Sequence, residues 1–215
     1  MTSRADWTNT THDWAASVDR AHLDAIRADP ARYAPGGVRH LLLEVLAYPE
    51  DEAESIGERG RCTVELYADG SVAVTDYGRG TDTRVDEHGN IVKKPVMATK
   101  DLRFFDAPEA PLLPDGCPRR GMSVVAALSE WLVHTNRRTN GSWTQRYEYG
   151  VPATGLEPIT PDGSTGTTVH FRPTAGSRRW TRSRTSTSPS SGLGDLGGSR
   201  DTGGRGRKVD DRAAR

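Results

Sequence analysis

Two groups of residues in this 215-residue chain have types and spacings that could do chemistry. In VTDYGRG, residues 74–80, an alternating apolar run ends on Asp76, and Gly78 and Gly80 follow after Tyr77. Such an acid either caps an ordinary turn or lies at the floor of a pocket, where the bare backbone of Gly78 lets a flat ligand approach. His40 and Glu44 form the second group, because their i, i+4 spacing places both on one face of a helix.

Acidic and basic residues balance over the whole chain but not along it. The 29 basic and 29 acidic residues cancel, yet residues 174–215 hold nine Arg and one Lys against four Asp, a net charge of +6. Residues 1–173 therefore carry a net charge of −6. The basic tail is rich in Gly, Ser and Arg and has little apolar surface to bury, so we expect it to be disordered.

The number and spacing of the cysteines and the lack of long apolar runs exclude several classes of protein. The two cysteines, Cys62 and Cys117, are far apart and form no C-x-x-C pair, which excludes a zinc-finger site. We predict no metal ligands and no disulfide framework, which favours a reducing compartment. The N-terminus has no apolar signal region, and no run approaches the ~20 residues of a membrane span. We therefore expect a soluble, cytoplasmic protein without a membrane partner.

Hydrophobic periodicity predicts the elements that position these residues. Segment 62–76 alternates on either side of Asp69-Gly70, which predicts a β-hairpin with a two-residue turn. Steps of three and four predict helices over 12–28 and from 38 onward, the second kinked or ended by Pro49. We also predict helices over 95–105 and 121–133, and strands over 134–138, 142–149 and 166–172. Helices beside a mixed, mostly antiparallel sheet make a two-layer α/β sandwich.

Four stretches carry a resemblance to a known family. They are LDAIRADPARYAPGGVRHLLLEV, VELYADGSVAVTDYGRG, GMSVVAALSEWL and QRYEYGVP with STGTTVHFRP, within about residues 12–173. Their order resembles the ATP-binding domain of the DNA gyrase B subunit, a type II topoisomerase, within the GHKL group that includes Hsp90, MutL and histidine kinases. The resemblance implies a Bergerat-type sandwich in residues 1–173, with ATP between the sheet, the helices and a lid.

The resemblance also implies roles for individual residues. Asp76 would accept a hydrogen bond from the adenine amino group, which a carboxylate favours over a carbonyl. Gly78 would leave room for the purine, and Thr167 would complete the contact. Glu44 would be the general base and His40 its support, the alternative being a pair that faces solvent. Further cofactor-binding positions are Arg79, paired with Glu52 or only a surface ion pair, and the lid glycines Gly116 and Gly121.

The chain departs from the family at the magnesium and phosphate positions. Tyr48 stands where the family has the asparagine that holds Mg²⁺, and a neutral phenol is a poor ligand, so Mg²⁺ is doubtful as a cofactor. In GCPRRG, Pro118 and Arg119 replace a histidine and a glycine of the lid. Our hypothesis is that Arg119 and Arg120 bind phosphate oxygens directly; the alternative is that both are free in solvent.

The leading hypothesis is therefore an ATP-binding domain with slow or absent hydrolysis, at most a weak ATPase, and with no DNA strand passage by itself. One alternative is a non-catalytic interaction module that has lost nucleotide, whose protein partner is unknown. Another is a nucleic-acid-associated protein that binds DNA through residues 174–215. That tail is either native or the product of an altered reading frame, and the sequence does not distinguish the two.

Overall fold

A seven-stranded sheet forms one layer of the computed structural model, which describes residues 11–12, 18–105, 107–139 and 141–177. These described residues belong to one compact unit. The sheet order is β1-β2-β9-β5-β6-β7, with β8 paired to β6, and all of these pairs are antiparallel. Its strands are β1 (Cys62–Leu66), β2 (Val72–Asp76), β5 (Ser129–Arg137), β6 (Trp143–Glu148), β7 (Val151–Pro152), β8 (Glu157–Pro158) and β9 (Gly166–Pro173).

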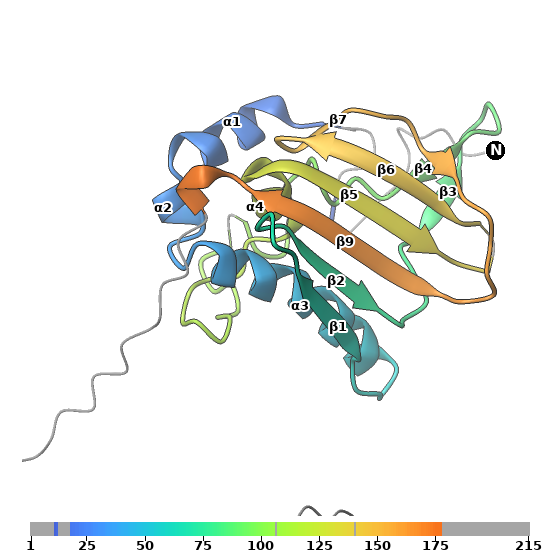
Figure 1. The fold of residues 1–215 in the computed structure, drawn as a ribbon, viewed down its shortest axis with the longest axis horizontal. Coiled ribbons are helices and arrows are strands. Elements are labelled where there is room, and N and C mark those ends of the chain that lie inside the picture. Colours follow the sequence, from blue (N-terminus) through green and yellow to red (C-terminus); the bar gives the residue numbers. More distant parts are fainter. Residues whose placement is uncertain (1–10, 13–17, 106, 140, 178–215) are drawn as a thin grey trace, which may run out of the picture. The chain divides into compact units, whose positions relative to one another are not determined.

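The last strand of the chain lies in the middle of the sheet. β9 runs between β2 and β5, so it joins the early hairpin to the later strands (Figure 1). Thr75 of β2 pairs with Thr168 of β9, which brings the end of β2 beside the start of β9. A separate two-stranded sheet contains β3 (Thr83–Val85) and β4 (Ile91–Lys93).

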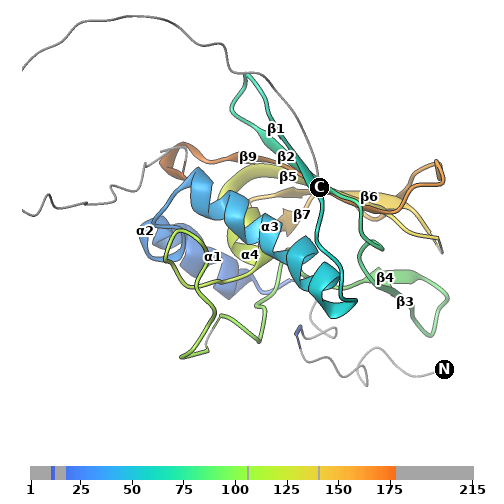
Figure 2. The same cartoon turned by 90° about the horizontal axis from the view of Figure 1, so that it is seen from below.

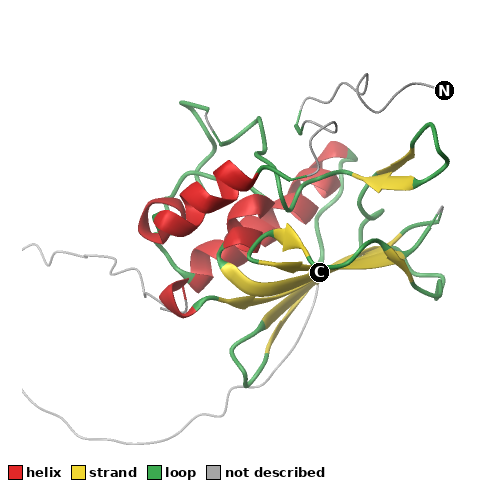
Figure 3. Ribbon diagram, turned by 90° about the horizontal axis from the view of Figure 1, so that it is seen from above, coloured by secondary structure: helices red, strands yellow, loops and turns green. Residues whose placement is uncertain are grey.

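The helices form the second layer. They are α1 (Arg20–Ala28), α2 (Pro30–Tyr33), α3 (Val38–Ser55) and α4 (Met122–Ala127), with a 3₁₀ turn, η2, over Ala175–Ser177. All four α-helices lie on one face of the large sheet (Figures 2 and 3). This arrangement confirms the predicted two-layer α/β sandwich with a mostly antiparallel sheet. None of the helices that the structure describes has the length and apolar character needed to cross a membrane.

The core lies between the two layers. From the helices it takes Leu23, Ile26, Leu41 and Val45, and from the sheet Val72, Val74, Leu132, Tyr147, Val169 and Phe171. Every residue of α4 is buried, which leaves no polar face on that helix. Each fully buried side chain of this size contributes about 1.5–3 kcal/mol relative to exposure, so this interface dominates the fold's stability.

The hairpin over 62–76 is confirmed, but its predicted two-residue turn is wrong. Tyr67 N donates to Ser71 O at 3.0 Å and Gly70 N donates to Tyr67 O at 2.9 Å, so three residues connect the strands. Gly70 adopts φ +82°, which such a bulged turn requires. Because β1 is an edge strand, Val64 and Leu66 stay exposed despite their alternation with polar residues.

Two predicted helices, over 95–105 and 121–133, differ from the observed structure. Residues 95–105 form turns, because the Asp101 side chain accepts from Arg103 N at 3.1 Å and competes with helical hydrogen bonds. The helix predicted over 121–133 ends at Ala127, and β5 begins at Ser129. The residues after Leu128 alternate between buried and partly buried, which is the period of a strand.

Three boundaries differ from prediction. α3 continues through Pro49 to Ser55, although proline removes one helical donor. α1 begins at Arg20, with the Asp19 side chain accepting from His22 N at 3.0 Å; of the predicted helix, 13–17 lie outside the described residues. Residues 174–177 belong to the fold, since Thr174 N donates to Leu128 O at 2.9 Å. The proposed disordered tail otherwise lies outside the described residues.

Candidate functional site

A cavity of about 490 Å³ lies between α3 and the sheet. α3, β2, β9 and the segments after β2 and before α4 contribute its walls. Its apolar lining comprises Val45, Val74, Val96, Met97, Met122 and Val169. Its polar lining includes Tyr48, Asp51, Glu52, Asp76, Arg79, Thr81, Asp82, Lys94, Arg103, His134, Arg138 and Thr167. Apolar walls with a few polar groups are typical of a small-molecule site.

Asp76 ends β2 and is held in a fixed orientation inside this cavity. Its Oδ1 accepts from Gly78 N at 2.8 Å, and its Oδ2 accepts from Thr167 N at 3.1 Å and from Thr167 Oγ1. The residue is 7% exposed. Three of the about four acceptor positions of the carboxylate are therefore used, and one remains for a ligand donor. Asp76 caps its turn and also faces a cavity, so the two interpretations of VTDYGRG coexist.

Glycines allow the backbones around Asp76 to approach closely. Gly166 has φ +127°, and a Cβ there would lie 2.1 Å from Asp76 O, so only glycine fits. A Cβ on Gly78 would lie 3.0 Å from Glu52 Oε2. Gly78 lines a smaller hollow of about 280 Å³ rather than the main cavity, so here its size serves the contact with Glu52.

An ion pair stands at the rim of the cavity. Arg79 Nε lies 2.8 Å from Glu52 Oε1, and Arg79 N donates to the same oxygen at 3.2 Å. The Arg79 side chain is 62% exposed, so the pair contributes little stability. Its effect is to fix the segment after Gly78 against α3.

Glu44 lies in a second polar cluster, at the start of α4. It is fully buried, and its Oε1 and Oε2 accept from Arg120 N at 2.6 Å and Gly121 N at 2.8 Å. Gly121 has φ +98°, and a Cβ there would meet Tyr48 Oη at 3.1 Å. The carboxylate thus occupies backbone donors at the beginning of α4.

His40 lies between two carboxylates. Its Nδ1 is 2.8 Å from Asp115 Oδ2 and its Nε2 is 3.4 Å from Glu44 Oε1. Burial alone would lower the pKa of His40, but the hydrogen bonds with Glu44 and Asp115 and the charges of both outweigh it and raise the pKa. The pair that could have faced solvent is instead fully buried.

Arg119 is held by internal partners. It is 5% exposed, its Nη1 donates to Asp51 Oδ1 at 2.8 Å, and its guanidinium lies between the rings of Phe104 and Tyr48, at 4.2 and 4.8 Å. Arg120 Nη1 donates to Phe105 O at 2.7 Å. The alternative that both arginines are free in solvent is therefore wrong.

Comparisons of the sequence with known proteins identify relatives of this chain. No family model matches the sequence. The chain is 32% identical over 156 residues to the B subunit of DNA topoisomerase 4 from Bacillus subtilis, and 35% identical over 159 residues to the B subunit of DNA gyrase from Archaeoglobus fulgidus; each match covers 70% of this chain. Its homologues are the B subunits of DNA gyrase and topoisomerase IV. The chain spans about a quarter of the length of these curated relatives, 24% and 25%.

A comparison with solved structures finds a similar fold in a protein of the same group. The chain is similar to a topoisomerase IV ATP-binding domain from Francisella tularensis, determined in complex with a small-molecule inhibitor. The TM-score is 0.57 at 25% identity, and the match covers 72% of this chain and 42% of that chain. The resemblance to gyrase B subunits is therefore confirmed.

The structure divides the residues predicted from this gyrase-B resemblance into two groups. Asp76, Arg79 and Thr167 line the cavity. The others do not line it: Glu44, His40, Gly78, Gly116, Gly121, Arg119 and Arg120. Six of these seven, Gly78 being the exception, belong to the polar cluster and loop before α4.

The residues around Tyr48 do not fit a magnesium ion. Tyr48 Oη donates to Asp101 Oδ2 at 2.8 Å, and burial, with Asp101 nearby, raises the pKa of Tyr48 well above its usual value. Tyr48 is therefore a neutral donor rather than a metal ligand. The neighbouring carboxylates have internal partners: Glu44 binds two backbone N–H groups and Asp51 binds Arg119.

Sequence reasoning missed two acids that complete these contacts. Asp101 and Asp115 are the partners of Tyr48 and His40, across 53 and 75 positions of the chain. Neither acid lies in a stretch that resembles the family, and no periodicity links them to α3. Only the fold brings them together.

Proposed function

We propose that the cavity binds an adenine nucleotide, ATP, with the base against Asp76. The observation that carries this proposal is the buried, oriented carboxylate, which has one acceptor position left and so favours an amino group over a carbonyl. Apolar side chains such as Val45 and Val169 suit a flat ring, and about 490 Å³ is within the usual range of ligand sites. The similarity to a topoisomerase IV ATP-binding domain supports the same assignment.

Hydrolysis is slow or absent in this proposal. Glu44 is the general base, with His40 as its support. Glu44 is fully buried, does not line the cavity and already accepts from Arg120 N and Gly121 N, so an attacking water in the cavity would reach it only if the loop before α4 moved. The lack of a fitting magnesium ligand at Tyr48 removes the usual neutraliser of phosphate charge. We assign no DNA strand passage to this chain by itself.

The phosphates need cationic partners, and two sets of residues are available. Arg119 and Arg120 are the set predicted from the sequence, but Arg119 would have to leave Asp51. Lys94 lines the cavity itself, and burial, with Arg103 nearby, lowers its pKa. A phosphate beside Lys94 would relieve that charge repulsion. We therefore propose Lys94 as the first phosphate partner, with Arg119 and Arg120 available only if the loop opens.

The test is isothermal titration with adenosine and with ATP in EDTA. Wild type binds both ligands. Lys94→Ala lowers the affinity for ATP several-fold and leaves the affinity for adenosine unchanged, because one charge-assisted hydrogen bond to phosphate is lost. If the Arg119→Ala/Arg120→Ala variant alone loses ATP affinity, the loop arginines are the phosphate partners instead. If neither ligand binds to wild type, the proposed function is wrong and a nucleotide-free interaction module is the better description.

The nucleic-acid alternative concerns residues that lie almost entirely outside the described structure. A basic Gly/Arg segment can bind DNA phosphates in a salt-dependent way. Deleting residues 178–215 removes none of the described residues, so salt-sensitive DNA binding lost on that deletion would assign DNA binding to the tail. DNA binding that survives the deletion would exclude that assignment.

A further inference from the structure

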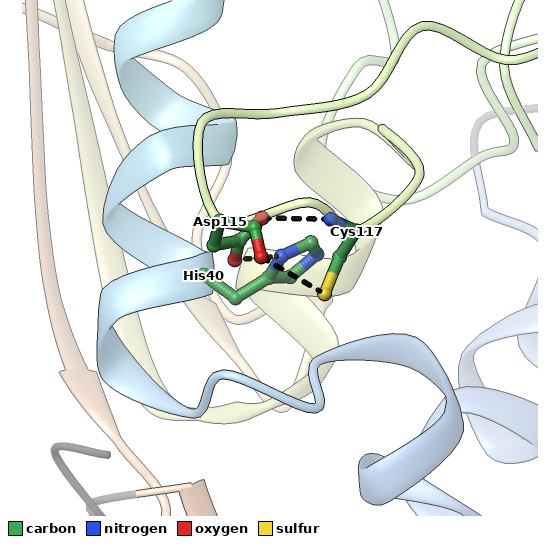
Figure 4. Close-up of side chains that lie close together, drawn as sticks. All are labelled: His40, Asp115 and Cys117. Atoms are coloured by element: carbon green, nitrogen blue, oxygen red, sulfur yellow. Dashed lines mark hydrogen bonds and ion pairs between the residues drawn. The ribbon is translucent and has the colours of Figure 1, made fainter. Parts of the chain in front are cut away.

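Three side chains with nitrogen, oxygen and sulfur ligand atoms meet beside Glu44. His40 comes from α3, and Asp115 and Cys117 come from the loop before α4; Figure 4 shows the three pointing toward one another. Their ligand atoms all lie within 4.8 Å of one another. The His40 side chain is fully buried and that of Asp115 is 4% exposed. This is a built cluster rather than a set of surface acids.

The loop is shaped so that both of its side chains face α3. Leu113 N donates to Cys117 O at 2.9 Å and Gly116 N donates to Leu113 O at 2.8 Å, which closes a tight hairpin. Gly116 has φ +80°, so the residue between Asp115 and Cys117 must be one that tolerates the left-handed region. Cys117 N donates to Asp115 Oδ1 at 3.1 Å. That bond orients the carboxylate and leaves Oδ2 directed at His40.

The second nitrogen of His40 has the partner that metal-bound histidines usually have. Its Nε2 lies 3.4 Å from Glu44 Oε1, an ion-pair distance without a hydrogen bond, and Arg120 N donates to the same oxygen while Gly121 N donates to Oε2. Histidine ligands commonly place a carboxylate on the ring nitrogen opposite the metal, which fixes the tautomer and the ring orientation. Glu44 is held in place to do this.

We propose that His40 Nδ1, Asp115 Oδ2 and Cys117 Sγ bind a transition-metal ion of the Zn²⁺ class, with water in the fourth position. Nitrogen, carboxylate and thiolate ligands suit Zn²⁺, whereas Mg²⁺ and Ca²⁺ require oxygen. Tetrahedral bonds of about 2.0–2.3 Å separate ligand atoms by about 3.5 Å, so the sulfur moves inward by about 1 Å, and His40 Nδ1 and Asp115 Oδ2, now 2.8 Å apart, move apart by about 0.5 Å. On binding, the thiol proton is released to solvent, and the proton between His40 Nδ1 and Asp115 Oδ2 also leaves, so that the neutral ring keeps its one proton on Nε2.

The bound ion would fasten the loop over 112–118 to α3. This site goes beyond the proposed function and does not depend on it, because none of its three ligands lines the cavity. A Cys-His nucleophile is the other chemistry that such residues allow. His40, however, directs Nδ1 to Asp115 and Nε2 to Glu44, and the contact found for Cys117 Sγ is with Asp115 O at 4.0 Å. Among the described residues no base is hydrogen-bonded to the Cys117 thiol, so metal binding is the better assignment.

The experiment uses the full chain, stripped with a chelator and titrated with Co²⁺ as a spectroscopic probe for Zn²⁺. Wild type takes up one Co²⁺ per chain with a sulfur-to-cobalt charge-transfer band, and Zn²⁺ displaces it. Cys117→Ser abolishes the band, and Asp115→Asn weakens binding by at least about tenfold. The chain has two cysteines, so Cys62→Ser is the matched control and keeps the band.

A second readout separates a ligand from a residue that only supports folding. Zn²⁺ raises the melting temperature of wild type and of Cys62→Ser, and leaves that of Cys117→Ser unchanged, because only a ligated ion stabilises the folded state. Three results would each overturn the proposal: no charge-transfer band in wild type, a band that persists in Cys117→Ser, or a band lost in Cys62→Ser. Nucleotide is absent throughout, so failure here leaves the nucleotide proposal standing.

Discussion

The two polar regions along α3 differ in how their charged groups are bound and in whether they face the cavity. At the cavity end, Asp76 is fixed by Gly78 and Thr167 and keeps one acceptor position facing open volume. At the loop end, Glu44 is fully buried and accepts from two backbone donors, and Arg119 is bound by Asp51 and packs against two rings while its Nε and Nη2 have no hydrogen-bond partner among the described residues. The first region is arranged for an external ligand and the second is arranged largely for itself.

This contrast separates binding from catalysis within one fold. Both regions resemble the gyrase B subunit in residue type, yet residue type alone does not say whether a polar group is available. A carboxylate with an acceptor position facing the cavity can select a base, whereas a fully buried carboxylate that does not line the cavity cannot activate a water there unless the loop moves. We therefore expect a change of the Asp76 carboxylate to alter ligand affinity, and a change of the Glu44 carboxylate to alter stability.

The largest effect should come from Gly166, which supports the cavity end. Gly166→Ala places a Cβ against Asp76 O in a backbone conformation that alanine avoids, so the free energy of unfolding falls by about 4 kcal/mol. Urea denaturation measures this. Gly163→Ala is the matched control, since Gly163 also has positive φ, +83°, but nothing lies near its Cβ, and it should lose only about 1 kcal/mol. Equal losses would mean that β9 does not approach Asp76 as described.

Asp76→Asn should weaken adenosine and ATP binding by more than about 100-fold. An amide that accepts from Thr167 turns its own N–H₂ toward the amino group of the base, so an acceptor is replaced by a donor, at a cost of about 3 kcal/mol. Titration calorimetry measures the loss. Asp69→Asn, in the exposed hairpin turn, should leave affinity unchanged. If Asp76→Asn keeps its affinity for adenosine and ATP, the adenine base does not bind at Asp76.

Asp101→Asn should reduce stability by about 2 kcal/mol at pH 7, because Tyr48 and Arg103 lose a charged acceptor. Burial alone would raise the pKa of Asp101, but hydrogen bonds from Arg103 and Tyr48 and the charges nearby lower it below 3.8. Its contribution is therefore complete above pH 3.8 and is lost as pH falls through the lowered pKa.

Wild type and Asp101→Asn should accordingly converge in stability in acid. Denaturation at a series of pH values measures the difference, with Asp24→Asn, an exposed carboxyl on α1, as the control that changes stability by less than about 0.5 kcal/mol. A difference between wild type and Asp101→Asn that grows as pH falls would contradict this assignment.

Glu44→Gln should give the smallest effect and the clearest separation of the two regions. The glutamine carbonyl can keep one of the two N–H donors, while its N–H₂ faces the other, so stability falls by about 1 to 2 kcal/mol. Adenosine affinity should stay within about threefold of wild type. Glu54→Gln, exposed on the same helix, should change neither quantity. A tenfold loss of adenosine affinity in Glu44→Gln would show that the two regions are coupled.

The hydrophobic periodicity of the sequence predicted those elements whose burial repeats regularly along the chain. The hairpin over 62–76 and the strand over 166–172 follow from strict alternation, and the layer architecture follows from their combination with helices. The helix predicted over 121–133 fails after Ala127 because a fully buried apolar run has no period that separates helix from strand. The turns over 95–105 depend on Asp101, whose side chain competes with the backbone.

The site was predictable only where both partners lie in recognisable stretches. Asp76 and Thr167 occur in two of the family-like segments, and the pairing of β2 with β9 brings them together. Asp115 and Asp101 have no sequence signal, because their partners on α3 are reached only after the chain folds back. The sequence therefore indicates which residue types lie at the loop end. It does not indicate whether their hydrogen-bonding groups already have partners within the protein.

The most direct test compares ATP with inosine triphosphate by calorimetry, with and without Mg²⁺. The two ligands carry the same phosphates, and inosine replaces the amino group that Asp76 would accept from with a carbonyl. We predict that ATP binds at least about tenfold more tightly, the equivalent of one good hydrogen bond, and that Mg²⁺ changes neither affinity by more than about threefold. Equal affinities for the two triphosphates, or ATP binding that requires Mg²⁺, would contradict a base site built on Asp76.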